Sequence, residues 1–208
     1  MLSDRRADRP TVDSSLVFAG KVWDVRSDRV DLGDDRIVQR DYVHHTGAVA
    51  VMVLNDAGEV YLVRQYRHPV RTETWEPPAG LTDIADEAPV ECAARELYEE
   101  ADLTAARWDV LVDFYSSPGG SSEGIRMFLA RDVAEVPQAD RFERHDEERD
   151  MEGRWVPLEQ VLAAIWAGEA SSPTLVAGAL ALDAARRADW TTLRPADAPW
   201  RKPPSLVR

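Results

Sequence analysis

The run GAVAVMVL at residues 47–54 constrains the fold most strongly, because it contains no charged residue. Such continuous apolar character is typical of a buried strand, whereas a strand with one solvated face alternates apolar and polar residues. The turn sequence NDAGE follows, and residues 60–67, VYLVRQYR, return the chain as a hairpin partner. The sequence therefore predicts a buried β-hairpin.

The rest of the chain mixes strand and helix patterns. Further strands are predicted at residues 108–117, 125–131 and 153–158, and helices at residues 89–103, 158–167 and 173–187. WEPPAG, residues 75–80, is punctuated by proline and glycine and is predicted as a loop. Strands interleaved with helices in this way predict an α/β or α+β layered domain.

The N-terminal region is predicted as a separate β extension. Residues 1–14 are polar and are expected to form a loose arm, whereas residues 15–32 and 37–43 are rich in strand formers and flank the turn sequence GDDR. We therefore divide the chain into an N-terminal arm and antiparallel β extension at residues 1–43, a main domain at residues 44–190, and a proline-rich C-terminal tail at residues 191–208.

Composition narrows the possible partners and the compartment. The 25 Lys and Arg residues against 38 Asp and Glu residues give a net charge of −13, which argues against nucleic acid as a partner. No apolar run reaches the roughly 18 residues that span a bilayer, so no membrane association is expected. The N-terminus lacks the apolar core of a signal peptide, and a single cysteine fits a reducing compartment. We therefore expect a cytoplasmic protein.

The stretch RELYEE, residues 95–100, crowds three glutamates into one helical segment. At about 100° per residue, Glu96 and Glu100 lie together beside the apolar stripe of the helix, and Glu99 lies one step further round. One arginine, Arg95, precedes Glu99 by four residues and can pair with it, but it cannot neutralise three acids. A divalent cation such as Mg²⁺ could, because hard cations prefer carboxylate oxygens. The alternative is a solvated charged face.

A longer frame around this helix distinguishes the two interpretations. Gly80, Glu87 and the run RELYEEADL together resemble the Nudix box, the loop–helix signature of the Nudix hydrolases, which cleave nucleoside diphosphates linked to another moiety. Two positions depart from the family pattern. Six residues rather than five separate Gly80 from Glu87, unless Asp86 takes the place of the glutamate, and Asp102 occupies a position that is usually glycine. Aspartate tolerates a left-handed helix end better than most residues.

The resemblance implies a fold, a metal site and a cofactor. The fold would be an α/β/α sandwich with a mixed sheet, extended by the N-terminal antiparallel strands. Glu96, Glu99 and Glu100, with the backbone carbonyl of Ala79, would bind Mg²⁺, with Mn²⁺ as the alternative ion. Glu99 would also count among the catalytic residues. Glu87 and Arg95 would be structural, with the arginine orienting the glutamates.

Two segments outside the box resemble the ADP-ribose pyrophosphatase branch of the family. Pro118 lies fifteen residues beyond Leu103 in SSPGGS and marks this branch, so Pro118 and Gly119 are predicted to contact substrate; the alternative is a simple turn.

The second segment, RQYRHPVRTETWEPPAG, clusters arginines in an acidic chain. Arg67 is the first candidate for binding the ligand, because a guanidinium can fork onto phosphate or stack on a base. Arg64 and Glu76 are second, and Trp75 is a candidate for base stacking. The alternative is a charged strand edge.

The acidic loop HDEERDME supplies candidates for the catalytic base. Hydrolysis needs a base that activates a water molecule. In this branch, the resemblance places that base on such a loop: Glu147 is the first choice, Glu148 the second, and Asp150 is expected near the metal. A solvated run of charge is the alternative.

The resulting hypothesis is a Mg²⁺-dependent hydrolase that splits ADP-ribose into AMP and ribose 5-phosphate. The alternatives are hydrolysis of another nucleoside diphosphate sugar or a dinucleotide, and a sensor that binds ADP-ribose without cleaving it. The N-terminal strands resemble the exchanged sheet through which ADP-ribose pyrophosphatases dimerise, which implies a homodimer. Cys92 is predicted to project away from the apolar stripe and to have no catalytic role.

Overall fold

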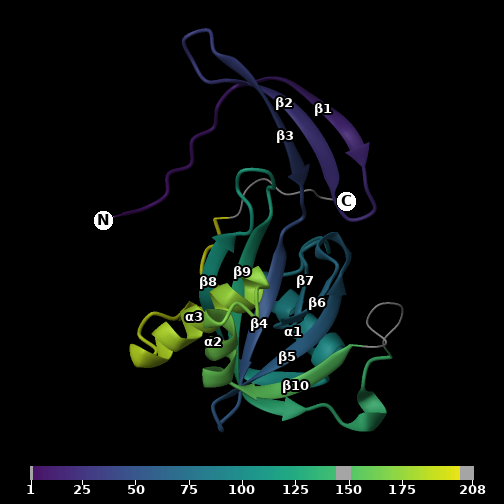
Figure 1. Cartoon of the computed structure of the whole chain (residues 1–208), viewed down its shortest axis with the longest axis vertical. Helices are drawn as coiled ribbons and strands as arrows, with labels where there is room; N and C mark the ends of the chain where they lie inside the picture. Colours follow the sequence, from purple (N-terminus) through teal and green to yellow (C-terminus); the bar gives the residue numbers. More distant parts are fainter. Residues whose placement is uncertain (1, 144–150, 202–208) are drawn as a thin grey trace.

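The computed structural model describes residues 2–143 and 151–201. Figure 1 shows a small N-terminal sheet that projects from a larger layered body. The small sheet is antiparallel, with strand order β1-β2-β3. Its strands are β1 (Thr11–Ala19), β2 (Asp24–Asp31) and β3 (Ile37–His44). The predicted β extension is therefore present, but it begins within the segment expected to be a loose arm.

The large sheet is mixed, as the sequence predicts. Strand β4 runs parallel to β9, and every other pairing in this sheet is antiparallel. The order is β10-β5-β4-β9-β8-β11, with β6 added to β5 and β7 added to β4. The strands are β4 (Ala48–Leu54), β5 (Glu59–Arg67), β6 (Thr72–Glu76), β7 (Ala79–Leu81), β8 (Leu103–Tyr115), β9 (Gly124–Glu135), β10 (Glu152–Pro157) and β11 (Arg194–Pro195).

Helices cover both faces of the large sheet and give the α/β/α sandwich (Figure 1). Helix α1 (Pro89–Ala101) packs on one face, and α2 (Leu158–Trp166) with α3 (Pro173–Arg187) packs on the other. Two short 3₁₀ helices, η1 (His68–Val70) and η2 (Gln138–Asp140), lie in connections. In the described residues, no helix is long and apolar enough to span a bilayer.

Strand β4 explains why residues 47–54 carry no charge. Val49, Val51 and Val53 pack in the cluster under α1, whereas Ala50, Met52 and Leu54 pack in the cluster under α2 and α3. Successive side chains of a strand point to opposite faces, so both sets must be apolar. Each fully buried Val, Leu or Met side chain contributes about 1.5–3 kcal/mol to folding. The strand therefore holds both layers together.

The segment at residues 75–80 differs from the predicted loop. It contributes the end of β6 and the start of β7, which pair with β5 and β4. Pro77 and Pro78 separate the two strands, and Val51 donates its backbone N–H to the carbonyl of Pro78 at 2.8 Å. The prolines interrupt pairing only locally, so the segment remains attached to the sheet next to α1.

A buried arginine attaches part of the C-terminal segment to the sheet. Arg126 is 1% exposed and forks onto Asp113 at 2.8 and 2.9 Å. It also donates to the carbonyls of Ala198 at 2.6 Å and Pro199 at 3.1 Å, and its guanidinium lies 5.2 Å from the ring centroid of Trp200. With the pairing of β11 to β8, these contacts hold residues 194–200 against the domain.

We predict that Arg126→Met destabilises the fold by roughly 1–3 kcal/mol, because two carbonyls lose their donor and Asp113 keeps Arg194 as a partner. Urea denaturation measures the change. Arg29→Met is the matched control, since Arg29 is exposed on the N-terminal sheet, and we expect it to change stability by less than about 0.5 kcal/mol. Equal stability of the two variants would contradict this role of Arg126.

Candidate active site

Helix α1 begins and ends at residues suited to those positions. Pro89 occupies the first turn, where its missing N–H has no cost. The carboxylate of Glu91 accepts a hydrogen bond from the backbone N–H of Ala88 at 3.0 Å. This N–H lies at the start of the helix and has no acceptor within it. The helix ends at Asp102, whose φ of 52° is left-handed. The sequence prediction that aspartate replaces the usual glycine at a left-handed helix end is confirmed.

Two of the three predicted metal ligands lie against the backbone of β7. Glu96 is 9% exposed and Glu100 is 8% exposed. The Glu96 carboxylate lies so close to Gly80 that a Cβ added there would be 2.0 Å from it, so a larger residue at this position would push the Glu96 side chain aside. Glu100 accepts the backbone N–H of Ala79 at 2.9 Å. The fold thus brings Glu96 and Glu100 to the Ala79–Gly80 backbone.

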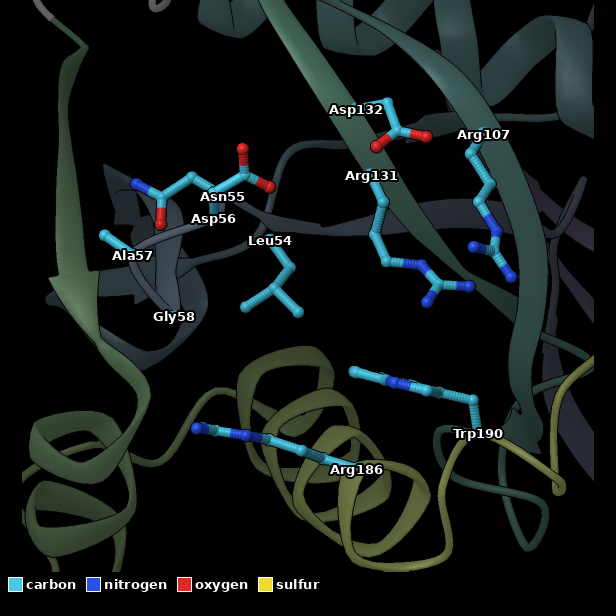
Figure 2. A pocket seen from close by; sticks show the side chains of 10 residues that line it. All are labelled: Leu54, Asn55, Asp56, Ala57, Gly58, Arg107, Arg131, Asp132, Arg186 and Trp190. Carbon is cyan, nitrogen blue, oxygen red and sulfur yellow. The ribbon is translucent and has the colours of Figure 1, made fainter.

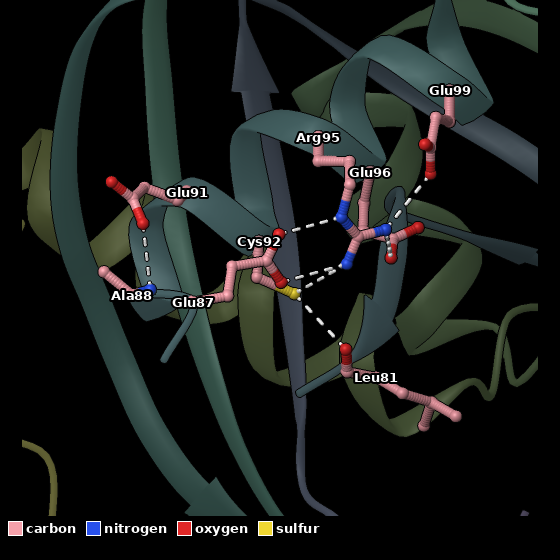
Figure 3. Close-up of polar contacts among 8 residues, drawn as sticks. All are labelled: Leu81, Glu87, Ala88, Glu91, Cys92, Arg95, Glu96 and Glu99. Atoms are coloured by element: carbon pink, nitrogen blue, oxygen red, sulfur yellow. Dashed lines mark hydrogen bonds and ion pairs between the residues drawn. The ribbon is translucent and has the colours of Figure 1, made fainter. Parts of the chain in front are cut away.

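Arg95 gathers the carboxylates of the loop and the helix (Figure 3). Its guanidinium forks onto Glu87 at 2.9 and 3.1 Å, and its Nη1 also donates to Glu96 at 2.6 Å and to Glu99 at 3.1 Å. The hydrogen bond from Arg95 lowers the pKa of Glu87, and the bond to Glu87 raises the pKa of Arg95. The Glu87 carboxylate therefore stays ionised beside the guanidinium.

The additional residue between Gly80 and the first glutamate is accommodated at Asp86. Asp86 adopts a left-handed φ of 62°, and the following residue, Glu87, is the one that meets Arg95. A left-handed residue turns the chain tightly, so one more residue fits without moving the glutamate away from the helix. Of the two acids left open by the spacing, Glu87 rather than Asp86 therefore pairs with Arg95 in the described structure.

The donor set of this site fits a hard divalent cation. Arg95 meets Glu87, Glu96 and Glu99, and Glu100 lies one helical turn beyond Glu96, so negative charge exceeds positive charge in a mostly buried place. Within the described ranges, no three His, Cys, Asp or Glu side chains are already gathered to hold an ion. Arg95 and the Ala79 N–H hold the carboxylates apart. Metal binding would therefore require Glu96 and Glu99 to turn from Arg95 toward Glu100.

The predicted ligand-binding residues between positions 64 and 76 lie on two different faces of the sheet. Arg67 forks onto Glu76 at 3.0 and 2.7 Å, and Thr74 also bonds Glu76. Tyr61 packs in the cluster under α1, and alternation along β5 places Arg67 on that same side. Arg67 and Glu76 are therefore on the face that carries the glutamates.

Trp75 and Arg64 lie on the opposite face. Trp75 packs against the cluster under α2 and α3, and the guanidinium of Arg154 lies 4.3 Å from its ring centroid. Arg64 lies 5.6 Å from the same centroid and pairs with Glu152 at 2.7 Å. Sequence reasoning missed Arg154, because only the pairing of β10 with β5 brings it to the tryptophan. A stacked base would have to displace Arg154 from that ring.

Pro118 and Gly119 lie in the β8–β9 connection, which contacts the N-terminal extension. Val43 donates its N–H to the carbonyl of Gly120, and Ser122 donates its N–H to the carbonyl of Val43, both at 2.9 Å. A cavity of about 390 Å³ lies between this loop and β3, lined in part by Pro118 and Gly119. The structure therefore brings these two predicted residues to the extension. The predicted catalytic residues Glu147 and Glu148, and Asp150, lie outside the described residues.

Comparison with known proteins agrees with this geometry. The family model described as NUDIX domain matches residues 44–176. The chain belongs to the Nudix family. It is 39% identical over 193 residues to the ADP-ribose pyrophosphatase of Mycobacterium tuberculosis (strain ATCC 25618 / H37Rv), covering 93% of this chain and 91% of that protein.

Two further comparisons extend the relationship. The chain is 33% identical over 158 residues to the ADP-ribose pyrophosphatase of Bacillus subtilis (strain 168), covering 76% of this chain and 83% of the relative. A solved structure described as an ADP compounds hydrolase superposes with a TM-score of 0.73 at 18% identity, covering 90% of this chain and 98% of the other. That structure shares the Nudix fold seen here.

Cys92 corrects one prediction from the helix pattern. The thiol does not project away from the apolar stripe: Cys92 is 1% exposed and donates to the carbonyl of Leu81 at 3.3 Å. Strand β7 covers this side of α1, so the buried arc of the helix is wider than its apolar residues indicate. Burial, with Glu87 nearby, raises the pKa of the thiol from 9.0 to about 12.

We predict that Cys92 of the native protein resists alkylation by iodoacetamide at pH 8, because the thiol is buried and protonated. The raised pKa adds stability below pH 9, which is lost as the pH rises toward 12, because the unfolded chain ionises first. Mass spectrometry of timed samples measures labelling, with urea-unfolded protein as the control. Labelling of the native protein at the unfolded rate would contradict this assignment.

Proposed function

We propose that this Nudix protein hydrolyses the diphosphate bond of ADP-ribose, using one water molecule and releasing AMP and ribose 5-phosphate. The observation that carries the proposal is the cluster of Glu96, Glu99, Glu100 and Arg95 against Gly80, in a chain 39% identical to an ADP-ribose pyrophosphatase over 93% of its length. A protein that only binds ADP-ribose would not need this cluster of buried carboxylates.

Glu96, Glu99 and Glu100, with the carbonyl of Ala79, are the groups we assign to Mg²⁺, with Mn²⁺ as the alternative. A divalent cation bound there would supply Lewis-acid neutralisation of the diphosphate charge. The chain contributes placement: Arg95 is fixed by its two bonds to Glu87 and holds Glu96 and Glu99 beside the site, from where they would turn toward Glu100 when an ion binds. Groups that orient metal ligands typically change affinity or activity by about 10–100-fold when lost.

The remaining roles fall to residues near the glutamates and on the acidic loop. Arg67, held by its fork onto Glu76, presents a preoriented guanidinium on the α1 side of the sheet for a phosphate or for adenine. Glu147, or Glu148 in its place, would take the proton from the attacking water. Pro118 and Gly119 would contact the substrate from the side of the N-terminal extension.

We predict that Glu100→Gln lowers kcat/KM for ADP-ribose by at least about 100-fold. Loss of a metal ligand should reduce activity at least as much as loss of a group that orients such a ligand. Mg²⁺-dependent AMP release, followed by chromatography, measures the loss. Glu91→Gln is the matched control on the same helix. Glutamine can still accept the Ala88 N–H, so this variant should retain most activity.

Two results would count against the proposal. Near-normal activity of Glu100→Gln would remove the glutamate cluster from the reaction. Wild-type protein that binds ADP-ribose in Mg²⁺ without releasing AMP would identify a sensor instead. A panel with UDP-glucose and GDP-mannose tests the substrate class, and faster turnover of either would reassign the substrate within the same chemistry.

We further propose that the N-terminal sheet associates with a second copy of the chain. All nine residues of β1 are exposed, including Leu16 at 53%, Val17 at 63% and Phe18 at 57%. Exposed apolar residues gathered in one place are typical of a protein interface. The loop carrying Pro118 and Gly119 bonds to β3 of the same sheet, so association would bring the second copy near the predicted substrate loop.

We predict that Leu16→Glu/Phe18→Glu converts a dimer into a monomer, because charges at an apolar interface cannot be desolvated without cost. Sedimentation velocity measures the change. Trp166→Glu, at an exposed apolar residue on α2, is the control and should remain dimeric. A wild-type monomer, or a double variant that stays dimeric, would contradict the assigned interface.

A further inference from the structure

A second cavity lies far from the glutamate helix. It has a volume of about 380 Å³ and is formed where the β4–β5 turn, the strands β8 and β9, and the end of α3 meet. Gly80 pairs with Val49 near the start of β4, under α1, whereas Leu54 lines this cavity at the other end of β4, under α2 and α3. The two places are thus at opposite ends of one strand and on opposite faces of the sheet.

Three arginines from three elements line this cavity, with Arg107 and Arg131 side by side and Arg186 extending along the opposite wall (Figure 2). Arg107 and Arg131 are paired across β8 and β9, and Arg186 comes from α3. Few carboxylates pair with them in the described residues: Asp109 bonds Arg131 at 2.6 Å and lies 3.6 Å from Arg107, and Glu159 lies 3.3 Å from Arg186. Guanidinium donors therefore outnumber the carboxylate oxygens, which favours a ligand rich in acceptor oxygens.

Arg131 is fixed in place, whereas its two neighbours are accessible. Its side chain is 12% exposed, its guanidinium lies 4.6 Å from the ring centroid of Trp190, and its Nε is buried with no hydrogen-bond partner in the described residues. A buried donor without a partner costs about 1–3 kcal/mol. The side chains of Arg107 and Arg186 are 57% and 46% exposed. The cavity thus combines one rigid cation with two that can close on a ligand.

The backbone around the cavity is held in an unfavourable conformation. Asp132 and Trp190 both line it with left-handed φ values of 55° and 64°, and Asp189 beside them has 48°. Such conformations cost of order 1–3 kcal/mol for residues other than glycine and concentrate at functional sites. Here they place the Trp190 ring under Arg131 and bring Asp132 to the rim.

We propose that this cavity binds a small phosphorylated sugar. The guanidiniums of Arg107 and Arg131 would hold the phosphate, since arginine matches the geometry of phosphate oxygens, and the half-exposed Arg186 would turn in from α3 to close on it. The carboxylates of Asp56 and Asp132, which line the same cavity, would accept hydrogen bonds from the sugar hydroxyls. Its volume lies at the lower end of the roughly 300–1,000 Å³ found for small-molecule sites. The site is independent of the proposed hydrolysis.

Isothermal titration calorimetry with ribose 5-phosphate, in EDTA and at low salt, tests the proposal. EDTA removes divalent metal, so the acidic helix should not attract the phosphate. We expect one ribose 5-phosphate per chain, tighter binding than for inorganic phosphate, and no binding of ribose alone. Arg107→Gln/Arg186→Gln should weaken binding on the order of 100-fold, the loss of two hydrogen bonds to a charged group.

Arg29→Gln/Arg36→Gln is the matched control, since it removes two exposed arginines from the N-terminal region and should leave binding unchanged. Thermal melts of both double variants confirm that they are folded. Absence of ribose 5-phosphate binding, or equal binding by the two double variants, would overturn the site. Equal affinity for inorganic phosphate would overturn the role of the aspartates. AMP release measured separately keeps this outcome distinct from that of the proposed activity.

Discussion

The fork between Arg95 and Glu87 is the interaction on which the arrangement of the glutamates depends. It fastens the loop after β7 to the middle of α1, and it leaves Nη1 of the arginine to hold Glu96 and Glu99. Ionised carboxylates at this density would repel one another in a mostly buried place. Arginine offsets only part of that repulsion, so the cluster suits a ligand of high positive charge. Because Gly80 has no side chain, the Glu96 carboxylate of α1 can lie directly against the backbone of β7.

The sheet separates the two sites that we propose. Strand β4 is buried on both faces, so the α1 side and the α2–α3 side are chemically independent. The α1 side carries the glutamates with Arg67 and Glu76, and the other side carries Arg131 over Trp190. The N-terminal extension meets the loop of Pro118 and Gly119 instead, through backbone hydrogen bonds of Val43. Association through that extension would therefore act on substrate contacts and leave the arginine cavity unchanged.

Local patterns in the sequence predicted much of the fold and part of the site. The apolar run of β4, the helical period of α1 and the Gly80–Glu87–Arg95 spacing depend on neighbouring residues, so they could be interpreted before the strand order was known. Contacts across the sheet could not. Arg154 reaches Trp75 only because β10 pairs with β5, and the strand β7 that covers Cys92 was predicted as a loop. Arg126 is held by carbonyls more than seventy residues away, which no local pattern reveals.

The most direct test of the glutamate site is binding of Mn²⁺ followed by electron paramagnetic resonance, in which bound ion loses the sharp signal of free Mn²⁺. We expect that wild-type protein with ADP-ribose depletes the free signal, and that Glu96→Gln/Glu100→Gln restores it while the melting temperature stays near that of the wild type. Equal depletion by the wild type and the folded double variant would contradict the claim that these glutamates hold the ion.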